Sequence, residues 1–144
     1  MTRTSFTGQV GDQIFSRQLK LGTLDLFLYS AAAWITHRTH YDRDFAVSEG
    51  HEGVLVHGPL QGAHMIEPLN DWASANGGKL QGVGYRHLVP LVADTAIVIS
   101  ATVEQLQDVA DGTLVRVVLA IDKASGERCT SGWGTVLINK KGQP

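Results

Sequence analysis

The sequence predicts an α+β fold in which an antiparallel sheet carries its helices on one face. One segment, 57–76, has the length and apolar spacing of a long helix, and no other helical candidate in the chain is as long. Several segments rich in β-branched residues follow it, with turn signals between them. A chain of 144 residues corresponds to one domain with a sizeable core. We therefore expect a sheet that wraps around this helix.

The N-terminal third of the chain supplies a strand and a short helix. Residues 1–12 are polar and contain glycine, which indicates a flexible, extended lead-in. Residues 14–19 have the composition of a first strand. Thr23 is a candidate N-cap for a helix that ends near Trp34. The polar segment 35–53 that follows is either a solvated loop or a site.

The long helix is bounded by signals at both ends. A His-Gly-Pro turn at 57–59 precedes the apolar periodicity, and proline is favourable close to a helix start. The glycine pair 77–78 ends the helix. Pro68 lies in its second half and has no N–H to donate to the His64 carbonyl, so we expect a kink or a break there.

The segments after the helix predict a sheet. The last three of them are rich in β-branched residues, and the Asp-Gly and Ser-Gly pairs at 111–112 and 125–126 are hairpin turn signals. A short polar tail, 139–144, closes the chain and is expected to be flexible. The predicted strands form a meander over 79–90, 95–106, 113–121 and 128–138.

The composition excludes several classes of function. The formal charge of −2 gives no electrostatic reason to expect a nucleic acid partner. No apolar run approaches the ~20 residues of a membrane span, and the first residues do not form a signal peptide, so we expect a cytoplasmic protein without membrane attachment. Cys129 is the only cysteine, which excludes an internal disulfide and any CxxC motif.

The densest group of chemically active side chains lies at 37–44. A neutral imidazole with a carboxylate two residues away, as in His40 and Asp42, can serve as a general base or acid near pH 7. The alternative is a solvated loop whose charges pair locally, and the residues alone favour that alternative. No metal site is expected, because no zinc motif has the spacing of His37, His40, His51 and His57.

The pair His57-Gly58 has two compatible interpretations. Glycine can simply supply backbone freedom where the helix begins. The Gly58 N–H, at the positive end of a helix, can also polarise a carbonyl oxygen and stabilise a developing negative charge.

Four motifs, taken in order, resemble the MaoC-like hydratase/dehydratase branch of the hotdog fold. They are LFxYSAA at 26–32, HRxHYDRDFA at 37–46, GxxVHGPLQ at 53–61 and, more weakly, YRxLxPL at 85–91. The second and third motifs are specific and most similar to the mesaconyl-CoA-hydratase and fungal-synthase-like dehydratase subgroup. The resemblance covers about residues 23–90, whereas the C-terminal strands match only in pattern.

This resemblance implies a fold, an assembly and a reaction. The expected fold is a single hotdog domain over 1–144, with a long helix wrapped by an antiparallel sheet. The expected assembly is a homodimer, or a heteromer with another hotdog subunit, with an acyl-thioester tunnel at the interface. The expected reaction is reversible addition of water to a 2-enoyl thioester in fatty acid metabolism. The substrate would be an acyl-CoA or acyl-carrier thioester, with coenzyme A as part of the substrate and without a metal or redox cofactor.

The resemblance also assigns roles to residues. His40 falls on the family's catalytic histidine, in an H-x-D element with Asp42, and Gly58 falls on the glycine whose N–H holds the thioester carbonyl. His57 and Asp42 would then orient the reacting groups. The residues expected to meet the substrate are His37, Tyr41, Pro59 and Arg86, the last against the tunnel wall or the coenzyme A phosphates.

One position departs from the family pattern. Five residues before His40 the family carries Asp, or Asn in this subgroup, but this chain has Ile35, and Thr39 stands where the subgroup commonly has Ile. His40 would then work alone or with another polar group, or a partner chain would supply the carboxylate. The alternative is a non-catalytic or partner-dependent subunit of a heteromeric hydratase. A hotdog thioesterase is less supported, because the first turns of the helix offer no carboxylate before Glu67.

Overall fold

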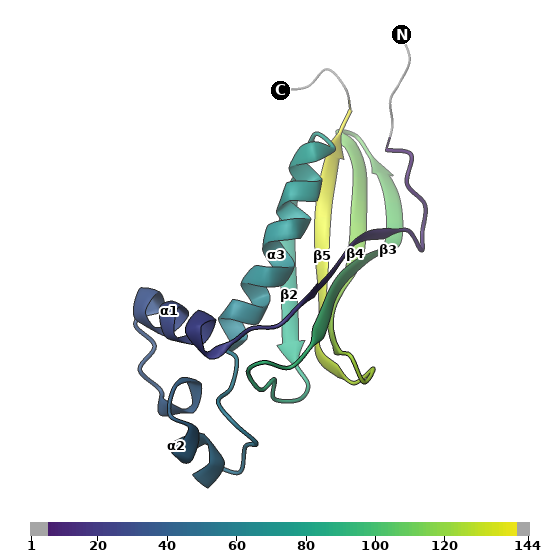
Figure 1. Ribbon diagram of the computed structural model, residues 1–144. Coiled ribbons are helices and arrows are strands. Elements are labelled where there is room, and N and C mark those ends of the chain that lie inside the picture. The colour runs from purple at the N-terminus through teal and green to yellow at the C-terminus, as the bar shows by residue number, and fades with distance from the viewer. Residues whose placement is uncertain (1–5, 141–144) are drawn as a thin grey trace.

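A five-stranded antiparallel sheet packs against the long helix α3 (Gly58–Ala75) in the computed structural model, which describes residues 6–140 (Figure 1). The strand order is β1-β3-β4-β5-β2, which confirms the α+β class. The expected four-strand meander is wrong in one respect. Strand β2 does not pair with β3, because β1 occupies that edge, and it pairs instead with β5 at the far side of the sheet. The strands are β1 (Gln13–Leu19), β2 (Gly78–His87), β3 (Ile97–Val109), β4 (Gly112–Lys123) and β5 (Arg128–Asn139).

Buried and half-buried side chains alternate along the central strands, and the buried ones form the core. On β3, Ile97 and Ile99 are buried, while the side chains between and after them, such as Ser100, are only half-buried. On β4 the odd-numbered residues from 115 to 121 are buried in the same way. Because successive side chains of a strand point to opposite faces, one face of the sheet is apolar and packs against α3. From the helix this core receives Met65, Leu69 and Ala73.

Helix α3 (Gly58–Ala75) has the predicted bounds, with His57 as its N-cap and Asn76 as its C-cap. Gly77 follows with φ +68°, a left-handed conformation that glycine adopts at low cost. The alternative of a break at Pro68 is wrong, since the helix continues through that residue (Figure 1). Pro68 is buried against the sheet, and this packing offsets the hydrogen bond that proline cannot make.

Two glycines on α3 let strand β2 approach closely. Gly58 and Gly62 are four residues apart and therefore lie on the same face of the helix. A Cβ at Gly58 would stand 2.6 Å from Nε2 of His87, and one at Gly62 would collide with the Tyr85 ring. Two aromatic side chains of β2 thus rest directly on the first two turns of the helix.

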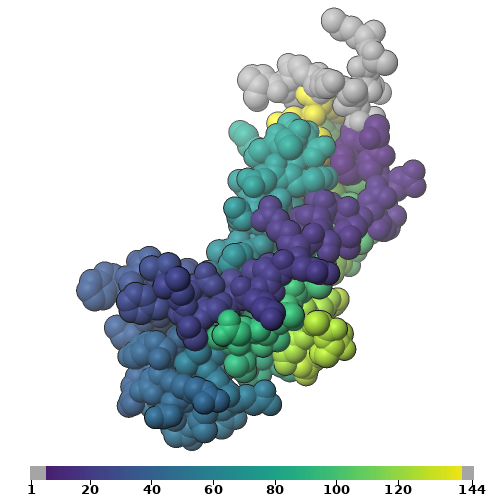
Figure 2. Space-filling view, in the orientation of Figure 1, coloured from purple at the N-terminus to yellow at the C-terminus, as the bar shows by residue number. Residues whose placement is uncertain are grey.

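The segment before α3 forms a projecting lobe (Figures 1 and 2). It contains α1 (Thr23–Ala33), the 3-10 turn η1 (Arg38–His40) and α2 (Arg43–Ser48). The polar segment 35–53 is therefore largely folded, because its own side chains satisfy the helix ends. Thr23 is the first residue of α1 rather than its N-cap, which is Gly22, and the Gly22 N–H donates to Asp25.

The two ends of the described chain are held by hydrogen bonds. The Gly11 N–H donates to the Val103 carbonyl, and the Lys140 N–H donates to the Asp111 carbonyl. Asn139, which was expected to open a flexible tail, is the last residue of β5. The remainder of the expected lead-in and tail, 1–5 and 141–144, lies outside the described residues. Among the helices of the described part of the chain, none combines the length and the apolarity that a membrane crossing requires.

Candidate active site

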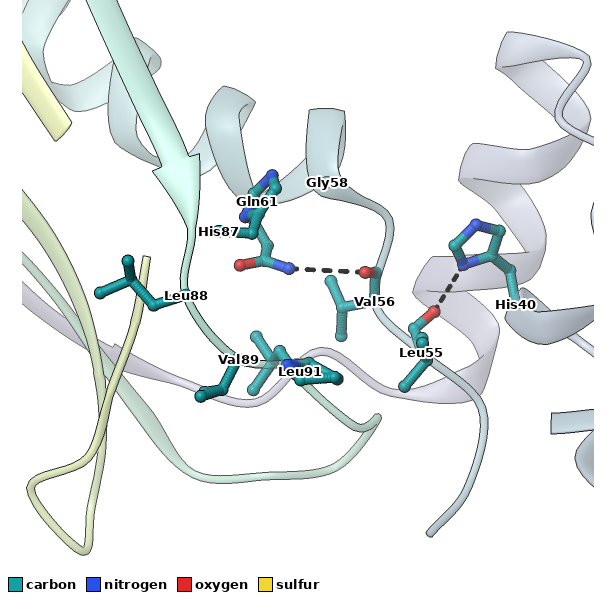
Figure 3. Close-up of a pocket in the computed structure, with 10 residues that line it drawn as sticks. His40, Leu55, Val56, Gly58, Gln61, His87, Leu88, Val89 and Leu91 are labelled. Atoms are coloured by element: carbon teal, nitrogen blue, oxygen red, sulfur yellow. Dashed lines mark hydrogen bonds between the residues drawn. The ribbon is translucent and has the colours of Figure 1, made fainter. Parts of the chain in front are cut away.

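A pocket of about 360 Å³ opens where the start of α3 meets the end of β2 (Figure 3). The 3-10 turn η1 contributes one wall, the chain entering α3 contributes the floor, and the segment leaving β2 contributes the other wall. Most of the lining is apolar, with a few polar groups among it. The lining residues are His40, Leu55, Val56, Gly58, Gln61, His87, Leu88, Val89, Pro90 and Leu91.

His40 has a defined tautomer. Its Nδ1 lies 2.7 Å from the Leu55 carbonyl oxygen, and a carbonyl oxygen can only accept. Nδ1 must therefore carry the proton, which leaves Nε2 of the neutral ring with a free lone pair. The imidazole is half-buried and lines the pocket, so this nitrogen can exchange a proton with a bound molecule.

His57 supports His40 from behind. Its side chain is fully buried, and the two imidazole rings stack with centroids 3.8 Å apart and planes inclined by 18°. Burial, and then the proximity of His40, lowers the pKa of His57 from 6.5 to about 4. The ring is thus neutral at physiological pH. Its Nε2 lies 2.8 Å from Oγ of Ser30, while its Nδ1 has no hydrogen-bond partner within residues 6–140.

Gly58 places a backbone N–H at the pocket floor. It is the first residue of α3, and in residues 6–140 its N–H has no backbone acceptor, as expected at a helix start. The helix dipole adds partial positive charge at this end. A carbonyl oxygen that develops negative charge would be stabilised here.

A chain of polar side chains links α3 to the sheet, buried at Gln61 and Thr130 and exposed at His87, and sequence reasoning missed it. Thr130 Oγ1 lies 2.7 Å from Gln61 Oε1 and 2.9 Å from Nδ1 of His87. The amide Nε2 of Gln61 donates to the Val56 carbonyl (Figure 3). Period-two alternation would have placed His87 on the same face of β2 as Tyr85, but the link to Thr130 depends on strand pairing that the sequence does not reveal.

Three predicted site residues lie in the lobe and do not line the pocket. The Asp42 carboxylate accepts the Phe45 N–H at the start of α2 and pairs with Arg38. These two interactions, in that order, hold the pKa of Asp42 below its usual value. His37 Nδ1 contacts the Thr39 hydroxyl, and Tyr41 donates to the Thr36 carbonyl.

Three further positions of interest are absent from the pocket lining as well. Pro59 is exposed in the first turn of α3. Arg86 is exposed on β2, next to His87, which is also exposed but lies against α3. Ile35 is half-buried, and its N–H donates to the Ser30 carbonyl at the end of α1. The structure therefore joins His40, His57 and Gly58, and adds Gln61 and His87.

A second hollow of about 460 Å³ lies between β1 and the start of β3. Lys20 is the only titratable side chain among its lining residues, so it lacks a pair of acid and base groups. Within residues 6–140, no three His, Cys, Asp or Glu side chains are grouped as metal ligands.

Comparison with known proteins defines the family. The model of the hydroxyacyl-thioester dehydratase type 2 family matches residues 3–93, which is more than half of the chain. The chain belongs to this family. The match contains every residue that lines the pocket, whereas Thr130 lies beyond it.

A curated relative and several solved structures agree with this assignment. A stretch of 67 residues is 37% identical to mesaconyl-C(4)-CoA hydratase of Chloroflexus aurantiacus. This stretch covers 46% of the chain but 23% of the relative, so the chain matches a small part of that protein. The (R)-hydratase from A. caviae involved in PHA biosynthesis superposes with a TM-score of 0.82 at 17% identity, over 93% of this chain and 99% of that one.

Two further solved structures share the architecture. A chain of the ChsH1-ChsH2 complex from Mycobacterium tuberculosis gives a TM-score of 0.79 at 20% identity, over 92% of this chain and all of that one. The MaoC-like dehydratase from Rhodospirillum rubrum gives a TM-score of 0.78 at 15% identity, over 94% of this chain and 96% of that one. These likenesses confirm the hotdog fold of this dehydratase-family chain.

Proposed function

We propose that this dehydratase-family chain adds water reversibly to a 2-enoyl thioester, and so dehydrates a 3-hydroxyacyl thioester in the opposite direction. One observation carries the proposal: the imidazole of His40, with its fixed tautomer, and the helix-start N–H of Gly58, which has no backbone acceptor within residues 6–140, belong to the same pocket. Membership of the hydroxyacyl-thioester dehydratase type 2 family supports it.

The Gly58 N–H would hold the thioester carbonyl oxygen. Attack of water at C3 pushes electrons toward that oxygen and produces an enolate-like charge. A donor that is already in place stabilises this charge more than it stabilises the neutral carbonyl, which accelerates the reaction. The N-terminus of α3 adds favourable partial charge at the same point.

His40 would act as an acid/base group. Its Nδ1–H is held by the Leu55 carbonyl, so the exchangeable position is Nε2. The stacked, neutral His57 ring fixes the plane of His40 without competing for its proton. A positioned imidazole typically contributes about 10²–10⁴-fold to such proton transfers.

The remaining walls suit an acyl chain. Leu55, Val56, Val89 and Leu91 surround the polar groups with apolar surface. Such a wall excludes water from the thioester and strengthens the interactions with Gly58 and His40. We expect the carrier, coenzyme A or an acyl carrier protein, to stay outside this cavity.

A second candidate, a partner-dependent subunit, is favoured by the surface of α1. Four large apolar side chains are exposed there and just beyond, namely Leu24, Phe27, Leu28 and Trp34, the last 87% exposed. Exposed apolar patches of this kind mark protein interfaces. Two structures similar to this chain are described as hetero-complexes, ChsH1-ChsH2 and HadBC, both from Mycobacterium tuberculosis. The partner would be a second copy or another hotdog subunit.

A thioesterase is less supported, since none of the ten lining residues carries a carboxylate.

Enoyl-CoA hydration by the purified chain, over short, branched and bulky acyl groups, tests the proposal. Turnover would show that the chain is sufficient and would identify its preferred acyl group. If the folded, soluble chain hydrates none of these substrates, the proposal that it is an enzyme without a partner would be contradicted. Recovery of activity after co-expression with a partner hotdog subunit would then favour the second candidate.

A further inference from the structure

His87 is the second titratable side chain that lines the pocket. It is the last residue of β2 and pairs across the strands with Thr130 of β5. Its Nδ1 lies 2.9 Å from the Thr130 hydroxyl oxygen. In Figure 3 the ring stands beside the first turn of α3, with Val56 between it and His40.

The hydrogen-bond chain behind His87 determines which nitrogen is free. The side-chain amide N–H of Gln61 donates to the Val56 carbonyl, so the amide oxygen Oε1 faces Thr130 as an acceptor. The single hydroxyl proton of Thr130 is therefore used on Gln61, at an O···O distance of 2.7 Å. The hydroxyl oxygen must then accept from His87, which requires the proton on Nδ1. Nε2 of His87 is left with a lone pair.

That lone pair lies at the proposed thioester site. A Cβ built on Gly58 would stand only 2.6 Å from Nε2 of His87. His40 stacks on His57, the residue immediately before Gly58. His40 and His87, two imidazoles with defined tautomers, therefore line the same pocket.

The pocket lacks the carboxylate that the family resemblance led us to expect. Ile35 occupies that sequence position, and the ten lining residues include no Asp or Glu. We propose that His87 is a second catalytic residue, which takes the role of this missing carboxylate opposite His40. The inference rests on the proposed hydratase function. Partial burial lowers the pKa of His87, which favours the neutral ring that a base requires.

The two imidazoles would divide one balanced reaction. In hydration, Nε2 of His87 accepts a proton from water as the oxygen bonds to C3, and the C2=C3 electron pair moves toward the carbonyl oxygen at Gly58. His40, protonated on Nε2, then delivers a proton to C2. The proton on His87 passes to solvent and His40 regains one before the next turnover. Dehydration follows the same steps in reverse.

Substitution of His87 tests the inference. We expect His87→Ala to lower kcat by about 10²–10⁴-fold with a smaller change in KM, and added imidazole to restore part of the loss. The matched control is His51→Asn, because His51 lies outside the pocket and should leave kcat within about two-fold of wild type. A folded His87→Ala variant with wild-type kcat would overturn the inference.

The pH profile gives a second readout. The titratable side chains nearest to His87 are Tyr85, whose ring lies beside it, His40, which lines the same pocket, and Cys129, which precedes Thr130 on β5; all three remain in the variant. If neutral His87 is the base, kcat/KM of the wild type falls at acid pH with an apparent pKa below 6.5. This fall in kcat/KM at acid pH should disappear in the His87→Ala variant assayed without added imidazole. If the fall persists in that variant, His87 is not the base.

The Thr130 link is tested without any assay of turnover. Nitrogen NMR of His87 should show a protonated Nδ1 and a free Nε2 in the wild type and in Thr130→Ser, but a tautomer mixture in Thr130→Val. A mixture in the wild type would overturn the argument. A wild type with the expected tautomer but no hydratase activity would instead show that the proposed function fails, and the catalytic role of His87 with it.

Discussion

The imidazole rings of His40 and His57 stack face to face, with centroids 3.8 Å apart, and only His40 reaches the pocket. One ring is buried and neutral, while the other can exchange protons with a bound molecule. Under the proposed function, His57 would support the site and His40 would carry out the proton transfer, so we expect different effects from replacing each residue.

Replacement of His40 should stop the reaction and leave the fold intact. We expect His40→Ala to lower kcat by about 10²–10⁴-fold, since it removes the acid/base group. The far-ultraviolet circular dichroism and the melting temperature should change little, because His40 is only half-buried and its bond to Leu55 joins two surface segments. Unchanged turnover would show that another residue moves the proton.

His57 should make the protein less stable as the pH falls. Its folded pKa of about 4 lies below the ordinary 6.5, so between these values the unfolded chain binds a proton that the folded chain rejects. Stability from this source is complete above pH 6.5 and is lost progressively down to about pH 4. The loss amounts to at most about 3 kcal/mol, at 1.36 kcal/mol per pKa unit.

Urea unfolding from pH 7 to pH 4 measures this dependence. The slope should be smaller in a folded His57→Asn variant, which has no imidazole to titrate. An equal slope in the two proteins would mean that other groups, such as His87, cause the acid sensitivity.

A methyl group at Gly58 should displace His87 rather than unfold the helix. The added Cβ of Gly58→Ala would stand 2.6 Å from Nε2 of His87, a ring that can rotate away. We expect kcat to fall at least ten-fold, while the free energy of unfolding changes by about 1 kcal/mol or less, because alanine is favourable in a helix. The matched control is Ala63→Ser, at an exposed position on the same helix. Gly50→Ala does not serve as a control, because Gly50 has a positive φ that alanine rarely adopts. A large loss of stability in Gly58→Ala would show instead that the helix start cannot accept a side chain.

Asp42 should matter for the lobe more than for proton transfer. Its carboxylate caps α2 and pairs with Arg38. Asp42→Ala should lower the melting temperature, and Asp42→Asn, which can still accept the Phe45 N–H, should restore most of it. We expect kcat to fall less than ten-fold in Asp42→Asn. A loss as large as that of His40→Ala would place Asp42 in the reaction.

The sequence predicted the long helix and part of the pocket, because both depend on local patterns. Apolar spacing, a starting proline and a terminal glycine pair define α3 within a residue or two. The resemblance pointed to His40 and Gly58, and the fold brings both to one cavity. The spacing of His40 and Asp42 was ambiguous, because an H-x-D sequence serves equally well as a helix cap.

The features that the sequence did not predict depend on distant pairing. Thr130 meets His87 and Gln61 across 43 and 69 residues, and only the register of β2 with β5 makes these contacts. The place of β2 at the far edge was missed for the same reason. Local propensity describes which segments are strands, but not which strands are neighbours.

The contact between Thr130 and Gln61 also limits how much local opening the pocket can tolerate. Within residues 6–140, β2 is an edge strand whose one neighbour is β5, and edge elements open at lower free energy than the centre of a sheet. When β2 separates from β5, His87 loses its contact with the Thr130 hydroxyl while strands β3 and β4 and helix α3 are still folded. Activity should therefore disappear at a lower denaturant concentration than the secondary structure of the domain as a whole.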